Sequence, residues 1–356
     1  MCGITGILNE EGKLIPGNLI VASISSMSFR YNGLGGGFAG YGIYPEYKEY
    51  YALHMIFNTE ETRSKVNELL NRRFDIIKDE PIPTRNVEAI KEAHLAIRGF
   101  EQLPITWRYF VKVPERYGMN ADDYVVETVM KINSSIPGAC VYSSGKNMGV
   151  FKAVGYPADV GKYFKIGEYE AYIWLGHGRY PTNTPGWWAG AHPFNILDWS
   201  VVHNGEISSY GTNKRLLEMW GYNCTFLTDT EVMAYLFDLL VRKHRLPLEI
   251  ACTAMASPFW SEIDKADSKT KQLLKTIRMI YGAALVNGPF SVLVGKNDAM
   301  IGFTDRIKLR PLIVAKKNNQ VYMASEECGI REICGNPDRI WAPKAGSAAI
   351  ARVRWA

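Results

Sequence analysis

The chain has 356 residues, of which 47% are hydrophobic, 12% aromatic and 22% charged. This composition excludes a disordered or low-complexity protein and supplies a sizeable core for one large domain or two ordinary ones. The net charge of +5 arises from 41 basic and 36 acidic residues spread along the chain, so we expect no nucleic-acid partner.

Six cysteines are too few for a disulfide framework, and their spacing matches no metal site. We therefore expect reduced thiols in a cytoplasmic protein. The opening residues MCGITGILNEEGK lack a basic region followed by an apolar run, so no signal peptide is expected. Apolar stretches of about 18 residues do not occur, which predicts no membrane-spanning helix and no membrane partner.

The first 42 residues contain a predicted strand, a predicted helix and a glycine-rich stretch. CGITGIL alternates small and β-branched residues before the turn cluster NEEGK, which predicts a strand and a hairpin-like turn. Residues 18–29 can form a helix. The stretch GLGGGFAGYG at 33–42 lacks the lysine and hydroxyl residue of a phosphate loop. We interpret it as a mobile loop beside a pocket.

Helical periodicity occupies residues 60–74, 86–99 and 120–136, with proline-containing breaks between them. Because β-rich segments flank this region, residues 58–140 are predicted to be a helical or mixed insertion. The insertion would lie within a single domain that spans residues 1–356.

Strands and helices alternate in blocks beyond residue 170. AYIWLGHG and WSVVHNG predict strands, and the TDTEVMAYLFDLLVRKH segment predicts a helix capped by Thr228 or Asp229. Residues 261–281 predict another helix. The final third predicts hairpins with turns at GKND and KKNNQ. Strand blocks at both ends with helices between them favour an α+β fold with stacked sheets.

Three short motifs contain groups that could perform chemistry. In HNGEI, the Asn204 amide and the Gly205 N–H could aim two neutral donors at one point, as in an oxyanion hole, although Asn-Gly is also a β-turn signal. In GRYPT, the Arg179 guanidinium suits a carboxylate. Asp229 in TDTE could cap a helix or bind an ammonium group. Arg179 and Asp229 together would hold the backbone end of a free amino acid.

Taken in order, CGITGI, GRYPTNT, WWAGAHPF, HNGEI, TDTE, DRIKLRPL and ASEE resemble the class II glutamine amidotransferase domain of the N-terminal-nucleophile hydrolases. The motifs look most like the amidotransferase domain of glutamate synthase, in the archaeal-type arrangement where it is a separate subunit. The resemblance implies a four-layer αββα sandwich with two stacked, mostly antiparallel sheets. Residues 58–140 match the family least.

The resemblance also implies a catalytic set. Removal of Met1 would leave Cys2 with a free α-amine, whose reference pKa of about 7.7 to 8.0 makes it a base near neutral pH. Cys2 would attack the carboxamide of L-glutamine, and Asn204 and Gly205 would stabilise the oxyanion.

Four residues are implied in substrate binding and positioning. Arg179 would hold the substrate α-carboxylate, Asp229 its α-ammonium, and Thr182 would add a hydrogen bond. Arg30 would position the N-terminal residue, and it lies in FRYNG where the family usually has an HRG-like element. Structural hydrogen bonding is expected of His177, His192 and His203, and structural roles of Asp305 and Arg310.

The resemblance implies a glutaminase subunit that passes ammonia to a partner glutamate synthase subunit in a hetero-oligomer. Because this sequence has no flavin or nicotinamide fingerprint, no cysteine cluster and no phosphate loop, we expect no cofactor or metal on it. FMN and an iron–sulfur cluster would reside on the partner. Two alternatives stay open: a subunit of an N-methylglutamate synthase or another ammonia-using system, and a non-catalytic glutamine-sensing module.

Overall fold

The structure is a computed structural model that describes residues 1–87, 103–115, 118, 120–181 and 186–355. The predicted helix at 86–99 therefore lies almost wholly outside the described residues, and so does Thr182. Among the described helices, none is long and apolar enough to cross a membrane. All six cysteines are free thiols.

The larger sheet has seven strands, and each strand is antiparallel to its neighbours. Its spatial order is β17 (Arg339–Trp341), β15 (Ile313–Lys317), β16 (Gln320–Ala324), β1 (Gly3–Asn9), β10 (Ile173–Gly178), β3 (Gly36–Tyr41) and β8 (Met148–Ala153). The N-terminal strand is thus central, which places the residues before it at the end of the sheet's middle strands.

The second sheet has five antiparallel strands. They are β11 (Phe194–Ile196), β12 (Trp199–Gly205), β13 (Phe290–Lys296), β14 (Ala299–Thr304) and β18 (Ala349–Arg352), in that spatial order. The sheet stacks on the larger one, with buried side chains such as Leu175, Val202 and Met300 between them. A Cβ added to Gly6 would lie 2.7 Å from Met300 Sδ, so this glycine permits the close approach of the sheets.

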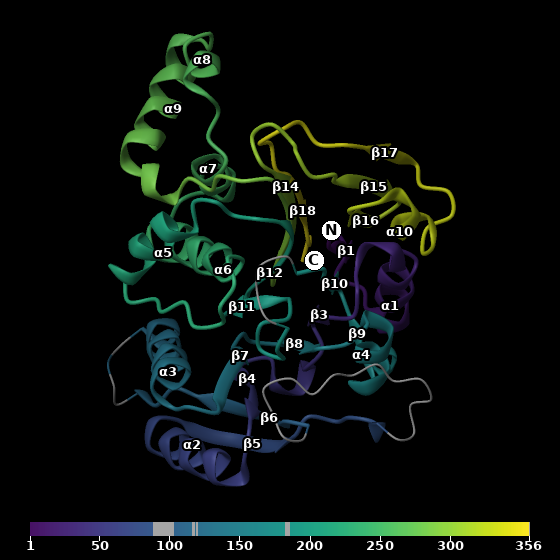
Figure 1. Ribbon diagram of the computed structural model, residues 1–356, viewed down its shortest axis with the longest axis vertical. Helices are drawn as coiled ribbons and strands as arrows, with labels where there is room; N and C mark the ends of the chain where they lie inside the picture. Colours follow the sequence, from purple (N-terminus) through teal and green to yellow (C-terminus); the bar gives the residue numbers. More distant parts are fainter. Residues whose placement is uncertain (88–102, 116–117, 119, 182–185, 356) are drawn as a thin grey trace.

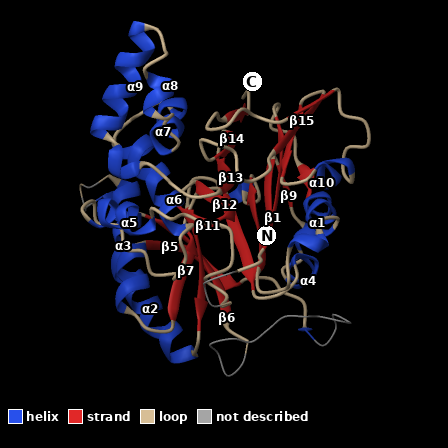
Figure 2. Ribbon diagram, turned by 45° about the horizontal axis from the view of Figure 1, so that its top comes forward, coloured by secondary structure: helices blue, strands red, loops and turns tan. Residues whose placement is uncertain are grey.

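Helices cover the outer face of each sheet (Figures 1 and 2). Against the larger sheet lie α1 (Gly17–Ser25), α4 (Pro157–Tyr163) and α10 (Glu327–Arg331); beside the smaller one lie α5 (Tyr210–Glu218), α6 (Glu231–Phe237) and α7 (Leu248–Met255). The arrangement is an α+β sandwich with the layer order αββα, as expected. Helices α8 (Trp260–Ile263) and α9 (Ser268–Ile280) extend from one end of this body (Figure 1).

The described residues within 58–140 belong to a mixed α/β unit at the opposite end (Figure 1). Its four-stranded sheet has the order β5 (Asp75–Pro81), β6 (Ile105–Lys112), β4 (Tyr51–Phe57) and β7 (Ala139–Ser143), flanked by α2 (Glu60–Arg73) and α3 (Ala121–Ser135). The Asn58 N–H donates to the Gly138 carbonyl at 2.9 Å, so the segment leaves and re-enters the body at adjacent points. That geometry is typical of an insertion, which stays a prediction.

The two described helices of this unit have capping residues and terminal charges that can be recognised in the sequence. The Thr59 hydroxyl accepts from the Thr62 N–H at the start of α2, and Asn120 accepts from two amides at the start of α3. Acidic residues fill the first turn of both helices, and Arg72 and Arg73 the last turn of α2, as the helix dipole favours. The predicted helices at 60–74 and 120–136 are therefore confirmed.

Predictions for the first 42 residues need two corrections. Strand β1 and the turn after it are confirmed, but the turn does not close a hairpin: β1 pairs with β10 and β16, while the short β2 (Ile15–Pro16) pairs with β9 (Glu170–Ala171). Residues 36–41 are not a loop but the buried strand β3. A Cβ on Gly37 would lie 2.3 Å from the His192 carbonyl oxygen, so glycine is needed here for close packing.

The helical predictions after residue 226 need two corrections. Helix α6 begins at Glu231, without a side-chain cap, because Asp229 accepts from the Ile207 N–H instead. The helix continues as the π-helical turn η6 (Asp238–Lys243). The helix expected at 261–281 is broken between α8 and α9, where Asp267 starts α9 by accepting from the Thr270 N–H. The hairpins β13–β14 and β15–β16 are confirmed.

Candidate active site

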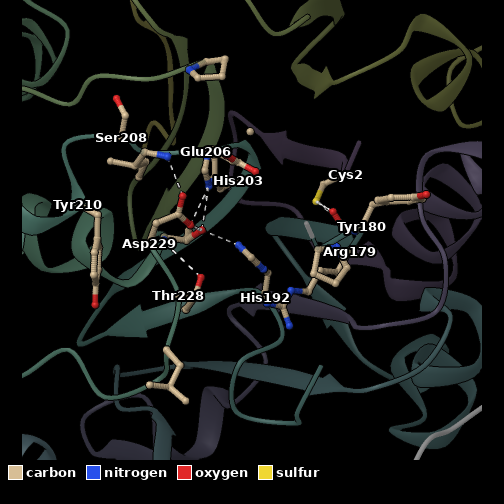
Figure 3. Close-up of a pocket in the computed structure, with 16 residues that line it drawn as sticks. Cys2, Arg179, Tyr180, His192, His203, Glu206, Ser208, Tyr210, Thr228 and Asp229 are labelled. Atoms are coloured by element: carbon tan, nitrogen blue, oxygen red, sulfur yellow. Dashed lines mark hydrogen bonds and ion pairs between the residues drawn. The ribbon is translucent and has the colours of Figure 1, made fainter. Parts of the chain in front are cut away.

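A cavity of about 610 Å³ opens where β1, β10 and β12 reach the edge of the two stacked sheets (Figure 3). It is lined by Cys2, Arg179, Tyr180, Pro181, His192, His203, Gly205, Glu206, Ile207, Ser208, Tyr210, Leu227, Thr228, Asp229, Thr230 and Pro289. Four residues singled out from the sequence are in this set, although they come from four separate parts of the chain. The fold therefore brings Cys2, Arg179, Gly205 and Asp229 to one cavity.

Cys2 lies immediately before β1 with its thiol at the cavity wall. The Tyr180 backbone N–H donates to Cys2 Sγ at 3.2 Å (Figure 3). Burial raises the pKa of the Cys2 thiol, while the Tyr180 N–H, the N-terminal amine and Arg179 act in the opposite direction. A thiol with a raised pKa needs a base to become a thiolate nucleophile.

Arg30 contacts the backbone of Cys2. Its Nε donates to the Cys2 carbonyl oxygen at 3.1 Å, and its guanidinium forms an ion pair with Glu326. Arg30 is not among the residues that line the cavity, so it is placed to orient the N-terminal residue rather than to touch a ligand there. The sequence motif ASEE contained Glu326, but nothing in the sequence linked it to Arg30.

Asn204 and Gly205 end β12 beside the cavity. The Asn204 side chain is fully buried, and neither its Nδ2 nor its Oδ1 has a hydrogen-bond partner among the described residues. Such an unpaired amide is rare in a native core. Asn204 is not among the residues that line the cavity, so its role as an oxyanion donor stays a prediction. Gly205 has a φ of +141°, and a Cβ on it would lie 1.8 Å from the Pro289 carbonyl oxygen. Only glycine fits at this position.

Arg179 and Asp229 lie on opposite sides of the cavity (Figure 3). Arg179 follows β10, where its N–H donates to the Gly35 carbonyl at 2.8 Å. Its guanidinium is buried, which lowers its pKa, while the nearby groups of Cys2 and Asp229 raise it. Asp229 is 27% exposed at its side chain, and its Oδ2 accepts from the Ile207 N–H at 2.7 Å. The cavity thus offers a cation and an anion across from one another.

Three buried histidines pack behind the cavity. The rings of His177 and His192 stack with centroids 4.0 Å apart, and His177 Nε2 hydrogen-bonds the His203 carbonyl oxygen at 3.0 Å. Burial lowers the pKa of all three, that of His177 to about 3, so they are neutral. Their contacts are structural hydrogen bonds, as expected, yet His192 and His203 also line the cavity.

The family follows from comparison with known proteins. The sequence model of the family "Glutamine amidotransferases class-II" matches residues 38–341. The chain belongs to this family. An uncharacterized protein of Archaeoglobus fulgidus is 49% identical to this amidotransferase, over 99% of this chain and 92% of that protein.

Other relatives of the amidotransferase are more distant. A putative glutamine amidotransferase of Methanothermobacter thermautotrophicus is 24% identical over 94% of both chains. The amidophosphoribosyltransferase of Methanocaldococcus jannaschii is 28% identical over 53% of this chain, and the match spans 35% of that protein. Among solved structures, the glutamine PRPP amidotransferase of B. subtilis aligns with 99% of this chain and 49% of its own, at 14% identity and a TM-score of 0.45.

Sequence reasoning missed several groups at the amidotransferase cavity. Tyr180 contacts the thiol through its backbone, which no side-chain pattern indicates. Thr230 lies inside the quoted motif TDTE, but only the structure places its hydroxyl between two histidines. Asp305 instead has the structural role expected of it, because its carboxylate accepts from the amides of Phe290, Ile307 and Leu309. The described residues contain no cluster of three or more metal-ligating side chains.

Proposed function

We propose that this class II amidotransferase chain hydrolyses L-glutamine to L-glutamate and ammonia through a thioester on Cys2. The observation that carries the proposal is the cavity itself, where the thiol of Cys2, the end of β12 at Gly205 and the charges of Arg179 and Asp229 face one space. A cation and an anion on opposite walls suit the α-carboxylate and α-ammonium of a free amino acid. The carboxamide end of glutamine would then lie toward Cys2.

The first half of the reaction uses the N-terminus as a base. After removal of Met1, the free α-amine of Cys2 takes the proton from its own thiol, and Sγ attacks the carboxamide carbon. The oxygen of the tetrahedral intermediate accepts from Asn204 Nδ2 and the Gly205 N–H. The protonated amine returns its proton to the leaving nitrogen, and ammonia departs.

The second half of the reaction hydrolyses the thioester. Water adds to the thioester carbonyl with the same α-amine as base, and the same two donors stabilise the second oxyanion. Collapse of this intermediate breaks the C–S bond, returns the proton to Cys2 and releases L-glutamate. Glutamine and water are thereby converted to glutamate and ammonia with no net change in the protein.

The finer part of the proposal concerns the destination of the ammonia. We infer a separate synthase subunit of glutamate synthase type, which would hold FMN and an iron–sulfur cluster, in a hetero-oligomer in the cytoplasm. The motifs GRYPTNT and WWAGAHPF and the free thiols support this reading. Because the relatives named above carry other activities in their names, co-purification followed by assay of the acceptor is the test. Formation of N-methylglutamate from methylamine instead would favour an N-methylglutamate synthase.

The hydrolytic part is tested by ammonia release from L-glutamine, with the co-purified partner present. Cys2→Ala should abolish release, whereas Cys328→Ala should leave it unchanged, because Cys328 is a second accessible thiol away from the cavity. Glutamine binding without ammonia release by the native chain would favour a sensing module. Full activity of the Cys2→Ala protein would contradict the proposal.

A further inference from the structure

The hydroxyl of Thr230 lies at the centre of a buried polar cluster beside the cavity. Its Oγ1 is 2.8 Å from His192 Nε2, 2.8 Å from His203 Nδ1 and 3.3 Å from Asp229 Oδ1. Thr230 is fully buried. Figure 3 shows Asp229 next to His203 and His192, and all three side chains line the cavity. Three polar groups therefore share one hydroxyl, which has one proton and two lone pairs.

The positions of the protons follow from counting donors. Both histidines are neutral, because burial lowers their pKa, so each ring carries one N–H. His192 Nδ1 and His203 Nε2 have no partner among the described residues. A proton on either atom would be a buried donor without an acceptor, which is more costly than an unfilled lone pair. The protons therefore lie on His192 Nε2 and His203 Nδ1.

Both ring N–H groups then donate to Thr230 and fill its two lone pairs. The hydroxyl proton has one remaining acceptor, Asp229 Oδ1. The other carboxylate oxygen, Oδ2, accepts from the Ile207 N–H at 2.7 Å. Each oxygen of Asp229 is thus held by one protein donor, which fixes the plane of the carboxylate and leaves its other lone pairs for the cavity.

The cluster is anchored in both stacked sheets. His203 belongs to β12, and its carbonyl accepts from His177 of β10. His177 also stacks on His192 with centroids 4.0 Å apart. The Thr230 hydroxyl is consequently held by a histidine ring of β12, and a carboxylate that is oriented in this way is pre-organised for a cation.

We propose that Thr230 is a positioning residue that orients the Asp229 carboxylate toward the α-ammonium group of the amino-acid substrate. This inference rests on the proposed function, which assigns the α-ammonium to Asp229. It predicts an effect confined to ligands that carry an α-ammonium. Loss of the hydroxyl weakens their binding, and ligands without that group are unaffected.

The experiment compares two ligands that differ only in the α-amino group. They are L-glutamine and glutaramate, which is glutamine without that group. Calorimetry in the Cys2→Ala background prevents turnover. Thr230→Val, which keeps the shape and removes the hydroxyl, should weaken L-glutamine binding about tenfold, as expected for a hydrogen bond to a charged group. Glutaramate binding should change less than about twofold. Thr230→Ser, which keeps the hydroxyl, should restore L-glutamine binding.

A double-mutant cycle ties the effect to Asp229. Asp229→Asn should show the same selective loss for L-glutamine, and adding Thr230→Val should cause little further loss, because the two residues act as one unit. Equal loss for both ligands, an unchanged L-glutamine affinity, or a Thr230→Ser protein as weak as Thr230→Val would each overturn the inference. Absence of any L-glutamine binding to the Cys2→Ala protein would instead contradict the proposed function, and this inference with it.

A spectroscopic measurement keeps the inference testable if Thr230→Val does not fold. Ring ¹⁵N chemical shifts of the histidines in the folded parent protein should report N–H on Nε2 of His192 and on Nδ1 of His203. A shift pattern with the opposite tautomer at either ring would direct the Thr230 proton away from Asp229. That result would overturn the inference.

Discussion

At the residue scale, Asn204 and Asn195 are both buried amides but differ in their partners. Asn195 donates to the Leu197 and Trp199 carbonyls and accepts from the Ser144 N–H, whereas Asn204 has no described partner. The first amide therefore stabilises the fold. The second has no such structural role, which is consistent with the oxyanion role proposed for it, because a native core seldom leaves an amide unpaired.

This contrast gives a matched pair of variants. Asn204→Ala should lower kcat for glutamine hydrolysis by roughly 100- to 1000-fold, because one oxyanion donor is lost. Its free energy of unfolding should stay the same or rise, since no hydrogen bond is broken. Asn195→Ala should lower the free energy of unfolding by about 2–3 kcal/mol. Chemical denaturation and steady-state kinetics measure both, and an Asn204→Ala protein with parental kcat would remove this amide from the mechanism.

The N-terminal amine predicts a pH dependence. Burial lowers the pKa of the Met1 amine; Cys2 opposes the shift, and Arg30 and Arg310 add to it. We expect the same two guanidinium groups to act on the Cys2 amine once Met1 is removed, since Arg30 Nε already donates to the Cys2 carbonyl oxygen. Activity requires the unprotonated amine, so kcat/KM should fall as pH decreases, with a midpoint below the reference range of about 7.7 to 8.0.

A substitution at Arg310 tests the direction in which the acid midpoint of kcat/KM moves. Arg310→Gln removes a positive charge that disfavours the protonated amine, so it should move the acid midpoint of kcat/KM to higher pH. Arg352→Gln removes a positive charge that pairs with Glu249 elsewhere and should leave the midpoint in place. A midpoint that moves to lower pH in Arg310→Gln would contradict the α-amine as the base.

At the element scale, strand β8 is tied to the segment before β11 by a buried lysine. Lys152 Nζ donates to the Ala189 carbonyl at 2.8 Å and to the Pro193 carbonyl at 3.2 Å. This segment carries His192 to the cavity wall. Burial lowers the pKa of Lys152 to about 7, against a smaller raising effect of Cys140 and Glu231.

Removing this tie should destabilise the protein. Lys152→Met leaves two buried carbonyls without their donor and should lower the free energy of unfolding by about 2–3 kcal/mol. Between pH 7 and about 10 the native state binds fewer protons at Lys152 than the unfolded chain does, so the advantage of the parent over Lys152→Met should grow with pH. Urea titrations at several pH values measure this. An advantage that shrinks over that interval would contradict the lowered pKa.

Some elements can be predicted from local sequence signals alone, and others cannot. Helices α2 and α3 carry their own caps, and the hairpins β13–β14 and β15–β16 carry their own turns, so all four follow from nearby residues. Strand β3 does not. Its glycines suggest a loop, and only tertiary contacts, such as the approach of the His192 carbonyl to Gly37, explain why this buried strand needs them.

At the scale of the whole molecule, stacking of the two sheets assembles the site. Cys2 precedes a central strand of one sheet, and Gly205 ends a strand of the other, so long-range pairing brings the ends of the two strands to one cavity. The motifs indicated which residues to examine through their family resemblance. They could not indicate the hydroxyl of Thr230 or the backbone of Tyr180, because those contacts depend on tertiary packing.

The most direct test of the central claim is intact-mass spectrometry of the protein mixed with L-glutamine and quenched in acid within one turnover. The account predicts a chain without Met1 and a transient mass increase of one γ-glutamyl group, mapped to Cys2 and absent from Cys2→Ala. A chain that retains Met1 and still releases ammonia, or an acyl group on any residue other than Cys2, would contradict it.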